Sequence, residues 1–199
     1  MEDMESEPQV DERMGPILEA AEQGKATIMG TLFDMYGLPV DTPGEDGDSA
    51  LHIGCLYGQK AVVEECLRRG ASVTARDEDS STPLHDACAG GYYEIAKLLV
   101  DHGALVDAQD NDGESPLHLA ANGGHGAVAE FLLTHAKQMD RNAAARMLFS
   151  KNALGQTPLD LAREGDDPTL VQRLQSVLQI GSAADGNGGA GGPRSKRRA

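Results

Sequence analysis

A four-residue pattern recurs along this chain at a fixed interval of 33 residues. Ser49-Ala50-Leu51-His52 is followed by Thr82-Pro83-Leu84-His85 and then by Ser115-Pro116-Leu117-His118. Small residues, a glycine, a second apolar stretch and another glycine follow each copy at matching offsets. Self-similarity at a period of about 20 to 50 residues is typical of proteins that stack one structural unit. The chain is therefore predicted to be a linear repeat array.

Each quartet carries residues that begin a helix. A hydroxyl at the N-cap accepts a backbone N–H that has no partner inside the helix, and proline suits the first helical position because its missing N–H is not needed there. Apolar residues at helical spacing, such as Ile95, Leu98 and Leu99, then predict a second helix. Glycines suit the left-handed backbone that ends a helix, and aspartates favour a turn before the next quartet. The predicted N-caps are Ser49, Thr82, Ser115 and Thr157, the first-position prolines are Pro83, Pro116 and Pro158, the helix-ending glycines are Gly70 and Gly103, and the turn aspartates are Asp77, Asp110 and Asp112.

The quartet, the small residues and the second apolar stretch ending in Gly-Ala together resemble the ankyrin repeat. The resemblance implies an all-α fold, an α-solenoid of about five ankyrin repeats, each a helix-turn-helix with a projecting β-turn loop. Two weaker copies flank the clear ones, and in them Leu18 and Asp160 stand where the inner copies have histidine. Terminal repeats, which face water on one side, are expected to deviate in this way.

The register predicts five repeats within one elongated domain, residues 15–180. Their approximate ranges are 15–47, 48–80, 81–113, 114–155 and 156–180. Repeat four contains a nine-residue insertion, and Met139–Phe149 within it predicts a short extra helix with Asp140 as its cap. The flanks, an acidic segment at 1–14 and a Gly-rich basic tail at 181–199, are predicted to be disordered.

Cysteine usage and the lack of targeting signals predict a reducing cytosolic or nuclear location. Cys55, Cys66 and Cys88 occupy positions of small or apolar residues in the repeat, which indicates buried side chains rather than redox or metal roles. The acidic N-terminus lacks the apolar region of a secretory signal. No stretch approaches the roughly 20 apolar residues of a membrane span.

No catalytic or metal-binding pattern was found. His52, His85 and His118 follow the repeat period, and the resemblance implies that each braces its own turn by hydrogen bonding. HExxH, paired CxxC, GxSxG and phosphate-loop motifs are all missing from the sequence. We therefore expect a protein that is not an enzyme and that binds no metal and no cofactor.

The resemblance implies function in protein binding, with partners held by the loop tips and by the inner face of the first helices. Seven of nine free tip positions are acidic and none is basic, which predicts a partner protein with a basic surface. The alternative is that exposed turns simply favour aspartate. A net charge of −15 argues against nucleic acid as a partner. The nine tip positions are Glu45, Asp46, Asp48, Glu78, Asp79, Ser81, Asn111, Asp112 and Glu114.

The register also assigns positions on the groove side of the first helices. Tyr57 is the best anchor candidate, because an exposed tyrosine offers a large contact area and a hydroxyl at low entropic cost. Asp86 stands where neighbouring copies have Ile53 and Leu119 and so adds negative charge. The other groove positions are Leu56, Ala89, Gly90, Asn122, Gly123, Arg163 and Glu164.

The sequence thus favours a non-catalytic adaptor or scaffold that is a monomer on its own and does not bind membranes. One alternative is an acidic chaperone or inhibitor that masks a basic client, such as a ribosomal or chromatin protein, and another is a regulatory subunit of an enzyme complex. Two basic groups interrupt the acidity, Lys137, Arg141, Arg146 and Lys151 near the insertion and Arg194, Lys196, Arg197 and Arg198 in the tail. The tail is either a nuclear localisation signal or a solubilising segment.

Overall fold

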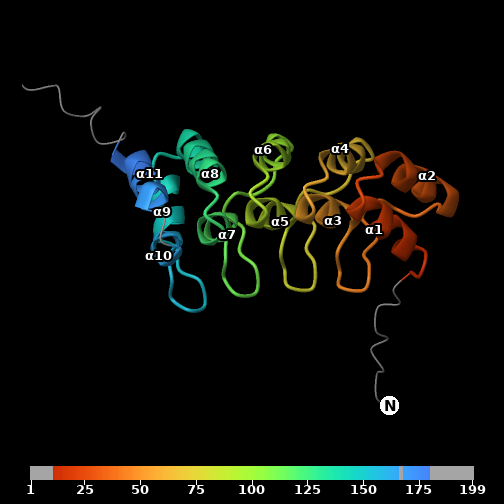
Figure 1. Cartoon of the computed structure of the whole chain (residues 1–199), viewed down its shortest axis with the longest axis horizontal. Coiled ribbons are helices and arrows are strands. Elements are labelled where there is room, and N and C mark those ends of the chain that lie inside the picture. The colour runs from red at the N-terminus through yellow and green to blue at the C-terminus, as the bar shows by residue number, and fades with distance from the viewer. Residues whose placement is uncertain (1–10, 166–167, 180–199) are drawn as a thin grey trace, which may run out of the picture.

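The computed structural model describes residues 11–165 and 168–179, which contain eleven helices and no strand. The helices pair into five units that stack in a line (Figure 1). The first helices form one row and the second helices another, and an additional helix, α9, follows α8. The predicted all-α repeat solenoid is confirmed. The first helices are α1 (Met14–Glu22), α3 (Ala50–Leu56), α5 (Pro83–Ala89), α7 (Pro116–Asn122) and α10 (Pro158–Glu164); the others are α2 (Ala26–Tyr36), α4 (Lys60–Arg68), α6 (Tyr93–Asp101), α8 (Gly126–Met139), α9 (Ala143–Phe149) and α11 (Pro168–Gln179).

Four of the first helices begin where the sequence predicted. Ser49, Thr82, Ser115 and Thr157 are the N-caps of α3, α5, α7 and α10 in extended backbone, and a proline follows three of them at the first helical position. Each of these N-caps also forms a capping box with the residue three positions later, a histidine in three cases and Asp160 in the last. Gly70 and Gly103 have the predicted left-handed backbone.

Two of the buried histidines, His85 and His118, join neighbouring units as well as bracing their own turns. Nδ1 of His85 accepts the backbone N–H of Thr82 at 3.0 Å, so Nε2 carries the proton of the neutral ring and donates it to the Glu114 carbonyl of the next unit at 3.2 Å. His118 repeats both bonds, with Ser115 and with the Ser150 carbonyl. Burial lowers the pKa of these histidines and so favours the neutral form that this arrangement needs.

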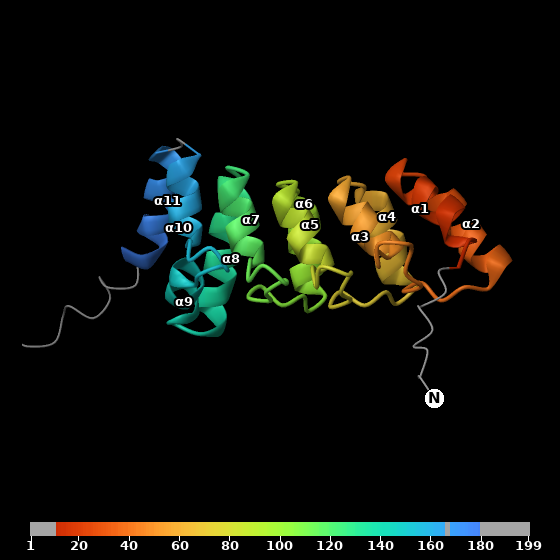
Figure 2. The ribbon, with the colours of Figure 1, turned by 90° about the horizontal axis from the view of Figure 1, so that it is seen from below.

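Small side chains let the first helices pack closely against one another. Ala87 and Cys88 of α5 are fully buried, as are Ala120 and Ala121 of α7. The leucines of the three inner quartets, Leu51, Leu84 and Leu117, are also fully buried. Figure 2 shows the first helices side by side along the array. The first helices approach one another more closely than the second helices do. The buried side chains form one continuous core along the stack, and few of them are aromatic.

The three cysteines are buried and free, as the sequence predicted. Burial raises the pKa of the Cys66 thiol to about 12 and raises that of Cys55 and Cys88 as well. Because the thiolate is the reactive form, these thiols are held in an unreactive state. They act as small apolar side chains in the core.

Two boundaries differ from the sequence prediction. The array begins earlier than residue 15, because Met14 is a buried residue of α1 and the Arg13 guanidinium donates to the Tyr36 carbonyl at 3.2 Å. In the insertion, α8 continues through Met139, and the extra helix starts only at Ala143. Asp140 is not its N-cap but closes the turn between the two helices by accepting the Asn142 N–H at 3.0 Å. The predictions made for residues 1–10 and 180–199 lie outside the described residues.

Replacing His85 tests the double hydrogen bond. His85→Ala removes the cap bond, the bond to the next unit and buried volume, so we expect the free energy of unfolding to fall by about 2–4 kcal/mol. His85→Asn, whose side-chain oxygen still accepts the cap N–H, should lose roughly half as much. Urea titrations of both variants measure this, and equal losses would show that the cap bond, which only His85→Asn keeps, contributes nothing.

Two glycines, one facing a packed side chain and one facing open space, provide a second test. A Cβ at Gly90 would collide with the Tyr92 ring although the backbone of Gly90 has an ordinary φ of −81°, whereas a Cβ at Gly15 in α1 would meet no atom within 4 Å. Gly90→Ala should therefore lower the free energy of unfolding by about 1–3 kcal/mol, and Gly15→Ala should raise it by about 0.5–1 kcal/mol through helix propensity. Thermal and urea unfolding measure both, and loss of stability in Gly15→Ala would contradict the packing argument.

Candidate functional site

Four loops project from the N-terminal ends of the first helices, on the side away from the second helices (Figure 1). We call them fingers 1 to 4, residues 44–48, 77–81, 110–114 and 152–156. In each, the N–H of the first residue donates to the carbonyl of the last, at 2.9 to 3.2 Å. Asp77 and Asp110 also accept a backbone N–H from the end of their own finger through the side chain. The fingers are thus four copies of one closed turn.

Neighbouring fingers are joined by backbone hydrogen bonds. The N–H of Glu78 donates to the Asp46 carbonyl at 3.4 Å, and that of Asn111 donates to Asp79 at 2.9 Å. The N–H of Ala153 in finger 4 likewise donates to Asp112 at 2.7 Å. Equivalent residues of successive fingers are therefore held at a regular separation, and the carboxylates of Asp46, Asp79 and Asp112 form a row.

The predicted tip residues fall into two groups. Glu45, Asp46, Glu78, Asp79, Asn111 and Asp112 are exposed, whereas Asp48, Ser81 and Glu114, which precede the N-caps, are half-buried. Two of the nine side chains have structural bonds: the Glu114 carboxylate accepts the Asn152 amide at 3.0 Å, and the Asn111 amide donates to the Glu78 carbonyl at 3.1 Å. The carboxylates whose side chains form no bond within the described residues are therefore concentrated at the tips of fingers 1 to 3.

The acidic row ends at finger 4, whose tip was not among the predicted positions. Its tip carries Ala153 and Leu154 where finger 3 carries Asn111 and Asp112, and the Leu154 side chain is 83% exposed. The exposed Lys151 directly precedes finger 4 in the sequence. Extending the register by one copy, with the nine-residue insertion included, would have identified this change from the sequence.

The groove candidates lie apart from the finger tips. Leu56 and Tyr57 are 44% and 46% exposed, and Asn122 is exposed as well. They stand at the C-terminal ends of α3 and α7, about 10 Å along seven-residue helices from the fingers that precede them. Tyr57 and the acidic tips therefore mark opposite edges of the surface formed by the first helices.

The same repeat units are recognised by comparison with protein families. One model of ankyrin repeats in three copies matches residues 17–110, and a second, of ankyrin repeats in many copies, matches residues 99–162. The chain is an ankyrin-repeat protein. None of the curated proteins compared with it matches. Ankyrin repeats generally mediate contacts between proteins.

Asp86 of this ankyrin array is not an exposed groove residue. It lies near the start of α5, largely buried, and its Oδ2 has no hydrogen-bond partner. Burial raises the pKa of its carboxyl to about 8, with further contributions from Asp48 and Asp77. Burial and the neighbouring carboxylates also raise the pKa of Asp48 to about 6. Asp86 is therefore mostly protonated at neutral pH and adds little of the negative charge that the sequence suggested.

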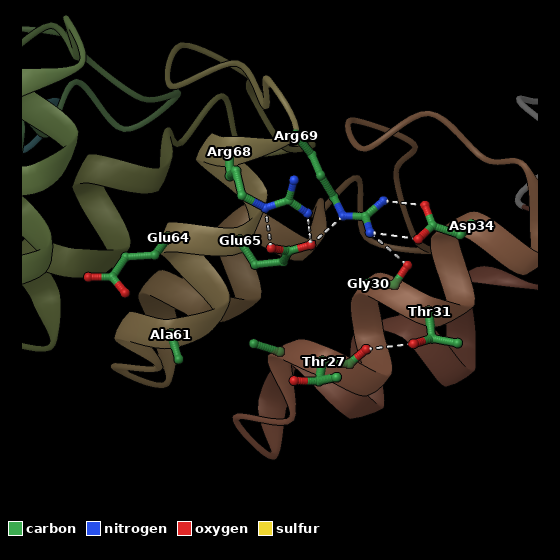
Figure 3. Close-up of a pocket in the computed structure, with 10 residues that line it drawn as sticks. Thr27, Gly30, Thr31, Asp34, Ala61, Glu64, Glu65, Arg68 and Arg69 are labelled. Carbon is green, nitrogen blue, oxygen red and sulfur yellow. Dashed lines mark hydrogen bonds and ion pairs between the residues drawn. The ribbon is translucent and has the colours of Figure 1, made fainter.

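A cavity of about 440 Å³ lies between α2 and α4 of the ankyrin array (Figure 3). Arg69 spans it, with bonds to Asp34 at 2.8 Å, to Glu65 at 2.6 Å and to the Gly30 carbonyl at 2.9 Å. Arg68 also binds Glu65, and the two guanidinium groups lower the pKa of that carboxyl to about 2. Because the charges of this cleft are satisfied within the protein, we interpret it as a structural link between repeats one and two.

The described part of the ankyrin array contains no group of three or more His, Cys, Asp or Glu side chains arranged to hold a metal ion. None of the helices in residues 11–165 and 168–179 has the length and apolar character needed to cross a membrane.

The titration of Asp86 can be tested through stability. Folding raises the pKa of the Asp86 carboxyl from 3.8 to about 8. The favourable contribution of the protonated carboxyl to folding is complete below pH 3.8 and is lost as the pH rises through about 8. Asp86→Leu, the residue type of Leu119, and the isosteric Asp86→Asn should therefore both stabilise the protein at pH 8, by roughly 2–5 kcal/mol for Leu. The difference in the free energy of unfolding between each variant and the parent should become smaller as the pH is lowered toward about 4. Urea unfolding at several pH values measures it, and a gain independent of pH would show that Asp86 does not titrate in this way.

Proposed function

We propose that this ankyrin-repeat protein is a non-catalytic adaptor that binds a partner protein with a basic surface along fingers 1 to 3. The observation that carries the proposal is the row of exposed carboxylates of Asp46, Asp79 and Asp112, held in register by hydrogen bonds between the fingers. Aligned like charges raise the local potential and accelerate encounter with an oppositely charged partner. Because the fingers are ordered before binding, little entropy is lost in arranging them.

The charge of the row also favours a protein over a nucleic acid. Phosphate backbones are bound by lysine and arginine, and none stands on fingers 1 to 3. The two ends of the row differ in chemistry, because finger 1 is acidic whereas finger 4 has Leu154 at its tip and Lys151 beside it. A partner segment can therefore be recognised in one orientation along the row. A partner segment with cationic residues followed by an apolar residue fits this order.

Neutralising the row tests the proposal. The variant Asp46→Asn, Asp79→Asn, Asp112→Asn keeps every backbone bond between the fingers, so its stability should lie within about 0.5 kcal/mol of the parent. Its affinity for the partner should fall at least roughly tenfold at about 0.05 M salt, mainly through slower association, and the difference should narrow at high salt. The matched control, Glu64→Gln, Glu94→Gln, Glu130→Gln, removes the same charge from exposed positions on the second helices.

The measurement has two stages. Proteins retained by the immobilised parent and by each variant are identified by mass spectrometry, and binding rates are then measured on the purified partner. Equal binding by the parent and the finger variant would overturn the proposal. One very basic client released by high salt would indicate the masking chaperone or inhibitor, whereas several salt-resistant partners would indicate an adaptor.

A further inference from the structure

A cavity of about 430 Å³ lies at the N-terminal end of the row of fingers and is lined by residues of α1, α3 and finger 1. Figure 1 shows α1 and α3 next to each other at this end of the array. Its floor is apolar, made by the buried Met14 and the half-buried Leu18 and Ile53. Its walls carry carboxylates, and neither lysine nor arginine is among the described residues that line it. We call it the N-terminal pocket. The wall carboxylates belong to Asp11, Glu12, Glu45, Asp46 and Asp48.

The apolar floor results from two departures from the repeat pattern. Leu18 stands where the inner units have the buried, hydrogen-bonded histidine, and it packs against finger 1, since a Cβ at Gly44 would lie 2.5 Å from Leu18 Cδ1. Ile53 stands where the next unit has Asp86. The corresponding place between α3 and α5 is therefore polar at both positions. The N-terminal pocket instead combines an apolar base with acidic walls.

Most of the wall carboxylates lack a partner. Asp11 forms an ion pair with Arg13. The side chains of the other four form no hydrogen bond or ion pair within the described residues. Glu12, Glu45 and Asp46 are exposed, and Asp48 is half-buried. The pocket thus has a surplus of negative charge at its rim and no internal cation to balance it.

We propose that the N-terminal pocket binds the side chain of a lysine or arginine of the partner protein. Such a side chain has an apolar stem and a cationic head, and it lies favourably on apolar surface with its head at a polar edge. The stem would cover the floor, and the head would meet the four unpaired carboxylates in charge-assisted hydrogen bonds. This inference rests on the proposed function and deepens it, because it names the residue type recognised at one end of the row.

Gly15 gives a way to close the pocket without changing its charge. It lines the pocket from α1, and a Cβ placed there would meet no atom within 4 Å. Gly15→Leu therefore projects a side chain into the space, whereas Gly15→Ala leaves most of the space open while sharing the gain in helix propensity. The two variants differ in occupied volume and keep the same net charge.

The experiment uses the whole protein and a defined probe, the neutral-ended peptide acetyl-Gly-Ser-Arg-Ser-Gly-amide, followed by NMR amide shifts at about 0.05 M salt. We expect saturable shifts centred on residues 14–18 and 44–48, with a dissociation constant on the order of 1 mM, as for a single anchored side chain. The peptide with citrulline, which has nearly the shape of arginine but no charge, should produce no such shifts. Gly15→Ala should bind as the parent does, and Gly15→Leu should weaken binding at least roughly tenfold.

Three results would overturn the inference: no saturable shifts with the arginine peptide, equal shifts with the citrulline peptide, or unchanged affinity in Gly15→Leu. These outcomes are distinguishable from failure of the proposed function. If the finger variant loses the partner while Gly15→Leu binds the arginine peptide normally, the acidic row stands and the pocket assignment is wrong. If the pocket binds arginine but the finger variant retains the partner, the pocket stands and the row is not the recognition surface.

Discussion

The two-sided hydrogen bonding of the buried histidines determines how the repeats of this protein are joined. Nδ1 of His85 accepts from the N-cap of its own helix, and this fixes the proton on Nε2, which then donates to the Glu114 carbonyl of the next finger. One neutral ring thus sets both the start of a helix and the position of the adjacent loop. Burial keeps the ring neutral, so packing and hydrogen bonding support each other. His52 is an exception, since its Nε2 is buried without a partner.

The display of charge depends on this framework. Short closed turns that are bonded to their own helices and to one another hold the carboxylates of fingers 1 to 3 at repeated positions. Flexible loops of the same composition would spread those charges apart to reduce their repulsion. The raised pKa of Asp48 in finger 1 reflects its burial first and then the neighbouring carboxylates of Asp77, Asp46 and Asp79. A cationic partner would relieve part of the repulsion on binding, because it supplies the opposite charge.

The two ends of the row of fingers differ in chemistry because each carries residues that depart from the repeat pattern. At the N-terminal end, Leu18 and Ile53 replace the polar residues of an inner unit and leave an apolar floor under acidic walls. At the other end, Leu154 replaces an aspartate, and the insertion adds α9 beside α8 and α10. The inner units share the capping box and the closed turn. Information about which partner segment binds, and in which direction, is therefore expected mainly at the ends of the row.

The sequence alone determined the starts of α3, α5, α7 and α10, the fold class and the burial of the cysteines, because these depend on local rules repeated every 33 residues. N-cap hydroxyls, first-position prolines and left-handed glycines act on their own turn, and the repeat confirms each assignment several times. The family followed from the same residues. The register also located the finger tips, since exposed positions are those that the repeat leaves without a fixed residue type.

Only the tertiary structure decided which of those positions are free. The register predicted that Asp86 and Asp112 both face a partner. Asp86 is half-buried, with its Oδ2 shielded from solvent, whereas Asp112 is exposed, because burial depends on contacts between units rather than on local sequence. Glu114 is held by Asn152, 38 residues away, and the N-terminal pocket is built from two helices and a finger that are distant in the chain. Tyr57 was correctly expected to be exposed, but its distance from the acidic tips follows from the direction of α3. Local chemistry thus fixed the repeated unit, and packing between the units fixed the surface that a partner meets.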